Sequence, residues 1–320
     1  MAITLGLGVT YHDTSVETSA KSPIRAIFGY GNGATNKTNL VNNYGGVALD
    51  TTGVGTARAE LAAAGYGGDK VIFGYGQIGA YVSMTNLVSN IGVVAGDITG
   101  VGTGRKALAA ATYGGDKAIF GYGEKANNTA EDFTAVTNKV SNTGVVVTDT
   151  AGIGIARRSL AAASYGVDKA IFSYGAGNTG GGGGVSTFNI PTNLVSNTGV
   201  VGASVTGVGT GRSSPAAAGY GGDKAIFGYG AVIGAASMTN LVSNTGIIAA
   251  DVTNITTARY ILAAAGYGGD KAIFGYGTNN TGTPPSFSLT NLVSNTGVVG
   301  ADITGVGTAR YGLAAASYSS

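Results

Sequence analysis

The chain has 320 residues, 58 of them glycine, a fraction more than twice the usual ~7%. Only 11% are charged and the net charge is +2, which gives no basic face for nucleic acid, while an apolar fraction of 44% argues against disorder. With no cysteine, no tryptophan and one histidine (His12), disulfide scaffolds, thiol nucleophiles and multi-histidine metal sites are excluded.

Residues 1–22 precede the repeated part of the chain and form a predicted N-terminal arm. The opening segment, MAITLGLGVTYHDTS, lacks the charged start and long apolar centre of a signal peptide. No apolar stretch of ~20 residues follows it, so we expect no membrane insertion. Residues 23–320 are predicted to form one domain.

Six copies of one unit make up that domain. The string AIFGYG, or a near copy, recurs at intervals of about 50 residues, a spacing typical of propeller repeats. Its phenylalanines are Phe28, Phe73, Phe120, Phe172, Phe227 and Phe274. A string close to TNLVSNTGVV follows each copy, and one close to TGVGTAR ends it.

Each unit contains four short β-type runs, shown in the second unit by LAAAGY (61–66), KVIFGY (70–75), MTNLVSN (84–90) and GVVAGDIT (92–99). The GGD before each lysine is a tight-hairpin signal, because glycine reaches positive φ at little cost. Val, Ile, Thr, Tyr and Phe dominate the runs, and no window has a sustained helical period. The pattern predicts an all-β fold, a six-bladed β-propeller of four-stranded blades.

The chain ends predict ring closure. The first copy of AIFGYG has no alanine-rich run before it, and the last copy is followed by a spare one, YGLAAASY (311–318). That C-terminal strand is expected to complete the first blade and remove the open edge. The alanine-rich runs are predicted to line the central channel, where only small side chains fit.

The paired glycines, the unit length and the arginine before each inner run resemble kelch-type propellers. Two features depart from that pattern, because Gly-Tyr-Gly replaces the usual Gly-Gly doublet and tryptophan is absent. The low charge and the richness in Gly, Ala, Asn and Thr are similar to propeller-like repeats in structural and tail-fibre proteins of tailed bacteriophages.

This resemblance implies a non-enzymatic structural or recognition module, located on a virion surface or extracellularly. Its partners would be other virion proteins or a host cell-surface protein or glycan, bound through variable loops on one face. The alternative is a free lectin-like propeller that binds glycans between its blades, with avidity from repeated sites.

One arginine ends each unit, and these arginines are predicted to ring the channel mouth. In five units an aspartate lies eight positions earlier, and Ser204 takes that place in the fourth unit. A ring of this kind binds anions, or it ties neighbouring blades through Arg–Asp or Arg–carbonyl contacts. The predicted ring consists of Arg58, Arg105, Arg157, Arg212, Arg259 and Arg310.

The stretch between Gly-Tyr-Gly and the third run varies from 6 to 16 residues, while the framework hardly changes. Insertions of this kind usually map to one face of a repeat protein, often the binding face. Aromatic and amide side chains there suit sugar stacking or protein contact, or they simply pack on the rim. The candidate binding residues are Phe133, Phe188, Phe287, Asn178 and Asn280.

No cofactor, metal or catalytic site is predicted. The segment Gly74–Gly79 matches GxGxxG, but β-like sequence follows it where a dinucleotide fingerprint needs a helix. The only acidic pair in a variable loop is Glu131 and Asp132, too few carboxylates for a calcium site. No carboxylate dyad breaks the repeat, so an enzyme is not expected.

Overall fold

The computed structural model describes residues 24–33, 35–126, 132–178, 186–188, 191–253, 256–279 and 286–319. Within these residues the chain is all-β, its strands pair antiparallel, and no α-helix occurs. The predicted arm, residues 1–22, lies outside the described part of the chain. None of the described segments forms a helix long and apolar enough to cross a membrane.

The second to sixth repeats each contribute three successive strands of one antiparallel sheet, and in the first sheet β26 takes the place of the inner strand. The inner strands are β3 (Ala62–Tyr66), β9 (Ala109–Tyr113), β14 (Ala161–Tyr165), β20 (Ala216–Tyr220), β23 (Ala263–Tyr267) and β26 (Ala314–Ser319). The middle strands are β1 (Ile24–Gly29), β4 (Lys70–Gly74), β10 (Lys117–Gly121), β15 (Lys169–Ser173), β21 (Lys224–Gly228) and β24 (Lys271–Gly275). The third strands are β2 (Thr38–Val41), β7 (Thr85–Val88), β12 (Thr137–Val140), β18 (Pro191–Val195), β22 (Thr239–Val242) and β25 (Thr290–Val293).

The sequence explains the first hairpin of each unit directly. In the second unit the turn has three residues, 67–69, and Gly67 and Gly68 adopt φ of 63° and 79°, the left-handed region that glycine reaches at little cost. The turn sets the register Tyr66↔Lys70 through Ala62↔Gly74 between β3 and β4. Burial alternates along β3, as expected for an inner strand with one face toward a cavity, whereas β4 is buried on both faces after Lys70.

The predicted fourth run of each unit is only partly a strand. In the first unit it meets β2 through two isolated bridges, Val41↔Val47 and Thr38↔Thr51, so five residues oppose four. That is a β-bulge, which interrupts the ladder. The side-chain amide of Asn39 fills the interruption by donating to the Ala48 carbonyl at 3.0 Å. Among the described residues, only the fourth unit has a regular strand here, β19 (Val205–Thr206).

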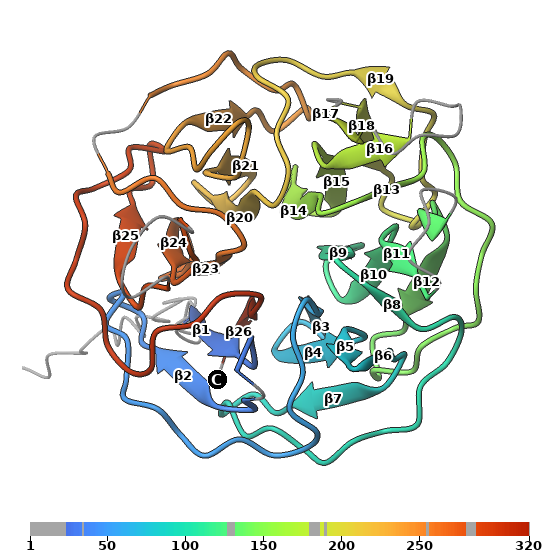
Figure 1. Ribbon diagram of the computed structural model, residues 1–320, viewed down its shortest axis with the longest axis horizontal. Coiled ribbons are helices and arrows are strands. Elements are labelled where there is room, and N and C mark those ends of the chain that lie inside the picture. Colours follow the sequence, from blue (N-terminus) through green and yellow to red (C-terminus); the bar gives the residue numbers. More distant parts are fainter. Residues whose placement is uncertain are drawn as a thin grey trace, which may run out of the picture.

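The first and last repeats share one sheet, whose order is β2-β1-β26. Here β1 pairs with β26 over Ile24↔Ser319 to Gly29↔Ala314, the pairing that the spare C-terminal run predicted. Each inner strand also lies beside the next inner strand, from β3 through β9, β14, β20 and β23 to β26, and β26 lies beside β3. Figure 1 shows the sheets around a common centre, with β26 next to β1.

The inner strands enclose a narrow cavity of about 90 Å³, lined by alanine, glycine, serine and threonine from all of them. This agrees with the prediction that the alanine-rich runs face the centre. Larger side chains pack between neighbouring sheets instead. The Phe73 ring meets the Tyr30 ring of the preceding unit edge-on, with 5.2 Å between centroids. A Cβ on Gly29 would lie 2.8 Å from the same Phe73 ring, which explains the glycine of AIFGYG.

Candidate functional site

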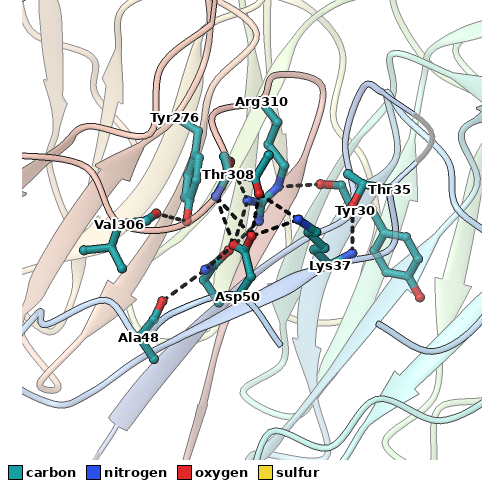
Figure 2. Close-up of polar contacts among 10 residues, drawn as sticks. Tyr30, Thr35, Lys37, Ala48, Asp50, Tyr276, Val306, Thr308 and Arg310 are labelled. Atoms are coloured by element: carbon teal, nitrogen blue, oxygen red, sulfur yellow. Dashed lines mark hydrogen bonds and ion pairs between the residues drawn. The ribbon is translucent and has the colours of Figure 1, made fainter. Parts of the chain in front are cut away.

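The arginine at the end of each unit reaches into the next unit, and Arg310 illustrates the arrangement (Figure 2). Its Nε donates to the Tyr30 carbonyl at 2.8 Å and its Nη2 to Asn39 Oδ1 at 2.7 Å. Its guanidinium lies over the Tyr276 ring, 4.3 Å from the centroid, and Nη1 lies 3.9 Å from Asp50 Oδ1. We call each such contact between two units an arginine seam.

The aspartate of a seam is held by groups from both units. Asp50 accepts hydrogen bonds from the Thr308 amide and hydroxyl, and one from Asn39 at 2.9 Å (Figure 2). Partial burial alone raises the pKa of Asp50, but these bonds and the nearby Lys37 outweigh it and hold the pKa well below its ordinary value. The carboxylate is therefore charged at neutral pH.

The structure corrects the predicted position of the arginine ring, and it shows the predicted Arg–Asp and Arg–carbonyl contacts between neighbouring units. All six arginines are buried, at 0 to 2% exposure, and none of them lines the central opening. Each aspartate pairs with the arginine of the preceding unit and not with the one eight positions later in its own. The pairs are Arg58–Asp97, Arg105–Asp149, Arg212–Asp251, Arg259–Asp302 and Arg310–Asp50, at 3.7 to 4.0 Å.

The opening on the arginine side is a cavity of about 290 Å³ formed two to three residues after each arginine. A closed series of backbone hydrogen bonds surrounds it, which we call the collar. Each collar N–H donates to a collar carbonyl of the preceding unit, at 2.7 to 3.2 Å. The collar residues are Glu60, Ala107, Ser159, Ser214, Ile261 and Gly312.

All collar residues adopt positive φ, between 51° and 66°. Only Gly312 does so without steric cost, and Ile261 is β-branched, for which this region is a genuine outlier. Strain of this kind persists only where the surroundings impose it. The sequence carried no signal for the collar, because its members share no side-chain type.

Side chains around the opening differ sharply between its two halves. On one half Lys106 lies 3.8 Å from Glu60 and 5.0 Å from the centre of the Tyr81 ring. The pKa of Tyr81 is raised to about 12. Burial is the larger cause, and the hydrogen bond that Tyr81 donates to Glu124 at 2.9 Å adds to it. Glu124, itself buried, also pairs with Arg158. These residues form a continuous charged network along the second and third units.

The other half of the opening carries no charged side chain among its described residues. Ser213, Tyr260 and Tyr311 occupy the positions that hold Lys106 and Arg158 on the charged half. Tyr260 and Tyr311 are half-exposed, and Ile261 is the aliphatic collar residue beside them. The opening is therefore lined by charged side chains from the second and third units and by uncharged ones, such as Ser214, Ile261 and Leu262, elsewhere.

The variable stretches begin on this face as short β-structures. In the second unit β5 (Gln77–Ile78) pairs with β6 (Ala80–Tyr81), and Ala59 bridges Gln77. The corresponding strands are β8 (Arg105–Lys106), β11 (Glu124–Lys125), β13 (Arg157–Arg158), β16 (Ala176–Asn178) and β17 (Ser186–Phe188). The GxGxxG segment thus leads from β4 into β5 and not into a helix, as the dinucleotide interpretation would require.

The predicted binding residues of these stretches separate into three groups. Phe133 is half-buried with the Arg158 guanidinium over its ring at 5.0 Å, and Phe287 is half-buried with its amide bonded to the Gly277 carbonyl. Both pack on the face. Asn178 and Phe188 lie on β16 and β17, where only their backbone is described. Asn280 and Glu131 lie outside the described residues, and Asp132 is buried.

The opposite face has a simpler chemistry. The Asp–Lys pairs of the hairpins lie there, with separations of 2.5 to 3.1 Å and lysines more than two-fifths exposed. Exposed pairs of this kind contribute ~0–1 kcal/mol each. The arrangement recurs in five units, but the exposed Val167 replaces a turn glycine in the fourth, and the first sheet has Ile24 and Ser319 in place of a hairpin.

No protein-family model and no curated protein sequence matches the chain.

Proposed function

We propose that the chain forms a closed six-bladed, kelch-like β-propeller, each blade having three regular strands and a bulged fourth. Three cyclic sets of contacts support this: the β1–β26 pairing, the backbone collar and the arginine seams. In each set the last repeat contacts the first as the other repeats contact their neighbours. A solenoid leaves its two end repeats apart.

We further propose that this propeller is a non-enzymatic recognition module whose contact surface is the arginine-side face. One observation carries the proposal. On this face a charged network along the second and third units breaks the sixfold framework, and Tyr260 and Tyr311 take the positions equivalent to Lys106 and Arg158 later in the chain. Aromatic side chains beside paired charges are typical of protein and glycan contact sites.

The test is binding of the labelled full chain to intact bacterial cells from a broad panel, since a host surface is the proposed target. Tyr260→Ala with Tyr311→Ala should abolish binding, because both aromatic contacts are lost. Lys224→Ala, on the opposite face, is the matched control and should bind as the unaltered chain does. Binding that survives the tyrosine substitutions but is lost with Lys224→Ala would assign contact to the opposite face.

A virion or tail-fibre location is part of the same proposal and rests on the compositional resemblance. An antibody raised against the chain should detect it in purified phage particles. Its absence from the particles, together with retained cell binding, would leave a free receptor-binding protein.

The second candidate function is a lectin with sites between blades. A cavity of about 360 Å³ favours it, lying where the first and second units meet on the arginine-side face. Asn32, Arg58, Glu60 and Gln77 line it and offer both donors and acceptors. A glycan array distinguishes the two candidates, because Gln77→Ala should abolish glycan binding by the lectin while Tyr260→Ala should not.

A further inference from the structure

The seam between the third and fourth units differs from the other five seams at two positions. In those five seams the residues at these two positions are hydrogen-bonded to each other. Ser204 replaces the aspartate, and Ile155 replaces the threonine whose hydroxyl binds that aspartate. The buried arginine is retained as Arg157, at 0% exposure. Among the described residues Arg157 forms no ion pair, whereas each of the other five arginines lies within 4.0 Å of a carboxylate.

Arg157 is also poorly satisfied by uncharged groups. Nη1 donates to the Ile155 carbonyl at 3.1 Å, Nη2 reaches the Phe172 carbonyl only at 3.5 Å, and Nε has no acceptor. The guanidinium lies over the Tyr122 ring at 4.1 Å, which stabilises its charge but does not cancel it. A buried cation without a counter-charge is strongly unfavourable.

The donors that hold a carboxylate in the other seams are still present here. In the Arg58 seam Asp97 accepts from the Thr56 amide at 3.0 Å and from the Asn86 amide at 2.9 Å. The equivalent donors are the Ile155 amide, which has no acceptor among the described residues, and the Asn193 amide, which donates to Ser204 Oγ at 3.1 Å.

Ser204 replaces one carboxylate oxygen but not the other. A Cβ on Gly154 would lie 2.3 Å from Ser204 Oγ, and a Cβ on Gly55 would lie 2.4 Å from Asp97 Oδ1, so these two oxygens occupy equivalent positions. The place of the second oxygen, Oδ2, lies beside the Ile155 amide and the Ser204 hydroxyl, whose own contact with Asn193 Oδ1 is long, at 3.5 Å. The seam thus keeps its positive charge and its donors and lacks the negative charge.

We propose that the Arg157 seam binds a small monovalent anion, chloride in the first instance, at hydrogen-bond distance from Ser204 Oγ on the side where the missing Oδ2 would lie. The Ile155 amide and the Ser204 hydroxyl donate to the ion, and Arg157 supplies the long-range charge. Arg and backbone N–H groups are the usual partners of anions in proteins. Asp97 is about one-third exposed in the equivalent place, so the ion has access from solvent.

The first test measures the unfolding temperature of the full chain as sodium chloride replaces sodium gluconate at constant ionic strength. Gluconate is too large for the position of one carboxylate oxygen. A ligand that binds only the folded state raises the unfolding temperature, here by about 2–4 °C. Ser204→Asp supplies a covalent carboxylate and should abolish this response. An equal response in both proteins would overturn the proposal.

The second test locates the ion by anomalous diffraction from crystals grown in sodium bromide. One bromide peak should lie beside Ile155 and Ser204, and Ser204→Asp should remove it. Asp251→Ser with Thr210→Ile recreates the same pair of residues at the Arg212 seam and should add a second peak there. Crystals with no peak at either seam would overturn the proposal even if the substituted chains prove unstable in solution.

Discussion

Each seam arginine takes a full positive charge out of water, and such a group is stable only when its hydrogen bonds and counter-charge are supplied. Arg212 is fully satisfied, as Arg58 and Arg310 are, with acceptors at Tyr229, Thr210 and Asn240 and with Asp251 at 3.8 Å. Three of these four partners belong to the following unit. The stability of the whole molecule therefore depends on single side chains at the seams.

Arg212→Met should destabilise the chain by about 3 kcal/mol or more, because it leaves buried acceptors without donors and Asp251 without its cation. Urea unfolding followed by circular dichroism gives the free energy. Lys224→Met is the control, since its exposed pair with Asp223 is worth ~0–1 kcal/mol. Equal small losses in both variants would contradict a role for the seam in stability.

The collar is the second feature that acts at the scale of single residues. Gly312 is its only glycine, and the space around it is open enough that an added Cβ would make only ordinary contacts, at 3.4 Å or more. Any penalty for a larger residue therefore comes from the backbone conformation, φ 66°, and not from crowding.

Gly312→Ile should cost about 1–2 kcal/mol, the penalty for a left-handed L-residue, while Gly312→Asn should cost less, because Asn tolerates this region. Thermal unfolding of the two variants side by side measures the difference. A loss that is the same for Asn and Ile would indicate crowding and not backbone strain.

At the scale of elements, the sequence predicted those structural features that the repeated strings of residues determine. The Gly-Gly-Asp hairpins, the alanine-lined centre and the pairing of the C-terminal run with β1 could be read from residue types and their order. The bulge could not, because its signal is the Asn39 side chain bonding to the Ala48 carbonyl and not any turn residue. The recurrence of Arg and Asp predicted a tie between neighbouring units, but only the structure shows that the partner of Arg58 is Asp97.

The strand β26 is the element on which the proposed closure depends, since it pairs with β1 and lies beside β3 and β23. A chain that ends at residue 312 exposes the full edge of β1 and should lose cooperative thermal unfolding. A synthetic peptide of residues 313–320, added in trans, should restore it by supplying the missing strand. A truncated chain that melts as sharply and at the same temperature as the full chain would show that the strand is dispensable.

At the scale of the whole molecule, the seams make stability depend on pH. The pKa values of Asp50, Asp97, Asp149, Asp251 and Asp302 are all lowered: burial opposes the shift, and hydrogen bonds from threonine and asparagine outweigh it. A carboxyl group whose pKa is lower in the folded state binds fewer protons there than when unfolded. Its contribution to the free energy of unfolding is fully present above the pKa of the unfolded state, ~3.9. This contribution is lost as the pH falls through the pKa of the folded state.

Because five carboxylates titrate in this way, the free energy of unfolding should be level near neutrality and fall steeply below about pH 4. Asp149→Asn removes one of the five, so this variant should be less stable at about pH 7 and should lose less stability between about pH 4 and about pH 2. Urea titrations of both chains across that range measure the two slopes. The control is Asp223→Asn, in an exposed hairpin where hydrogen bonds from Lys224 and Asn244 also lower the pKa, so that it removes such a carboxylate without removing a seam. If Asp149→Asn and the unaltered chain lost stability in parallel, the seam carboxylates would not be the groups that govern acid unfolding.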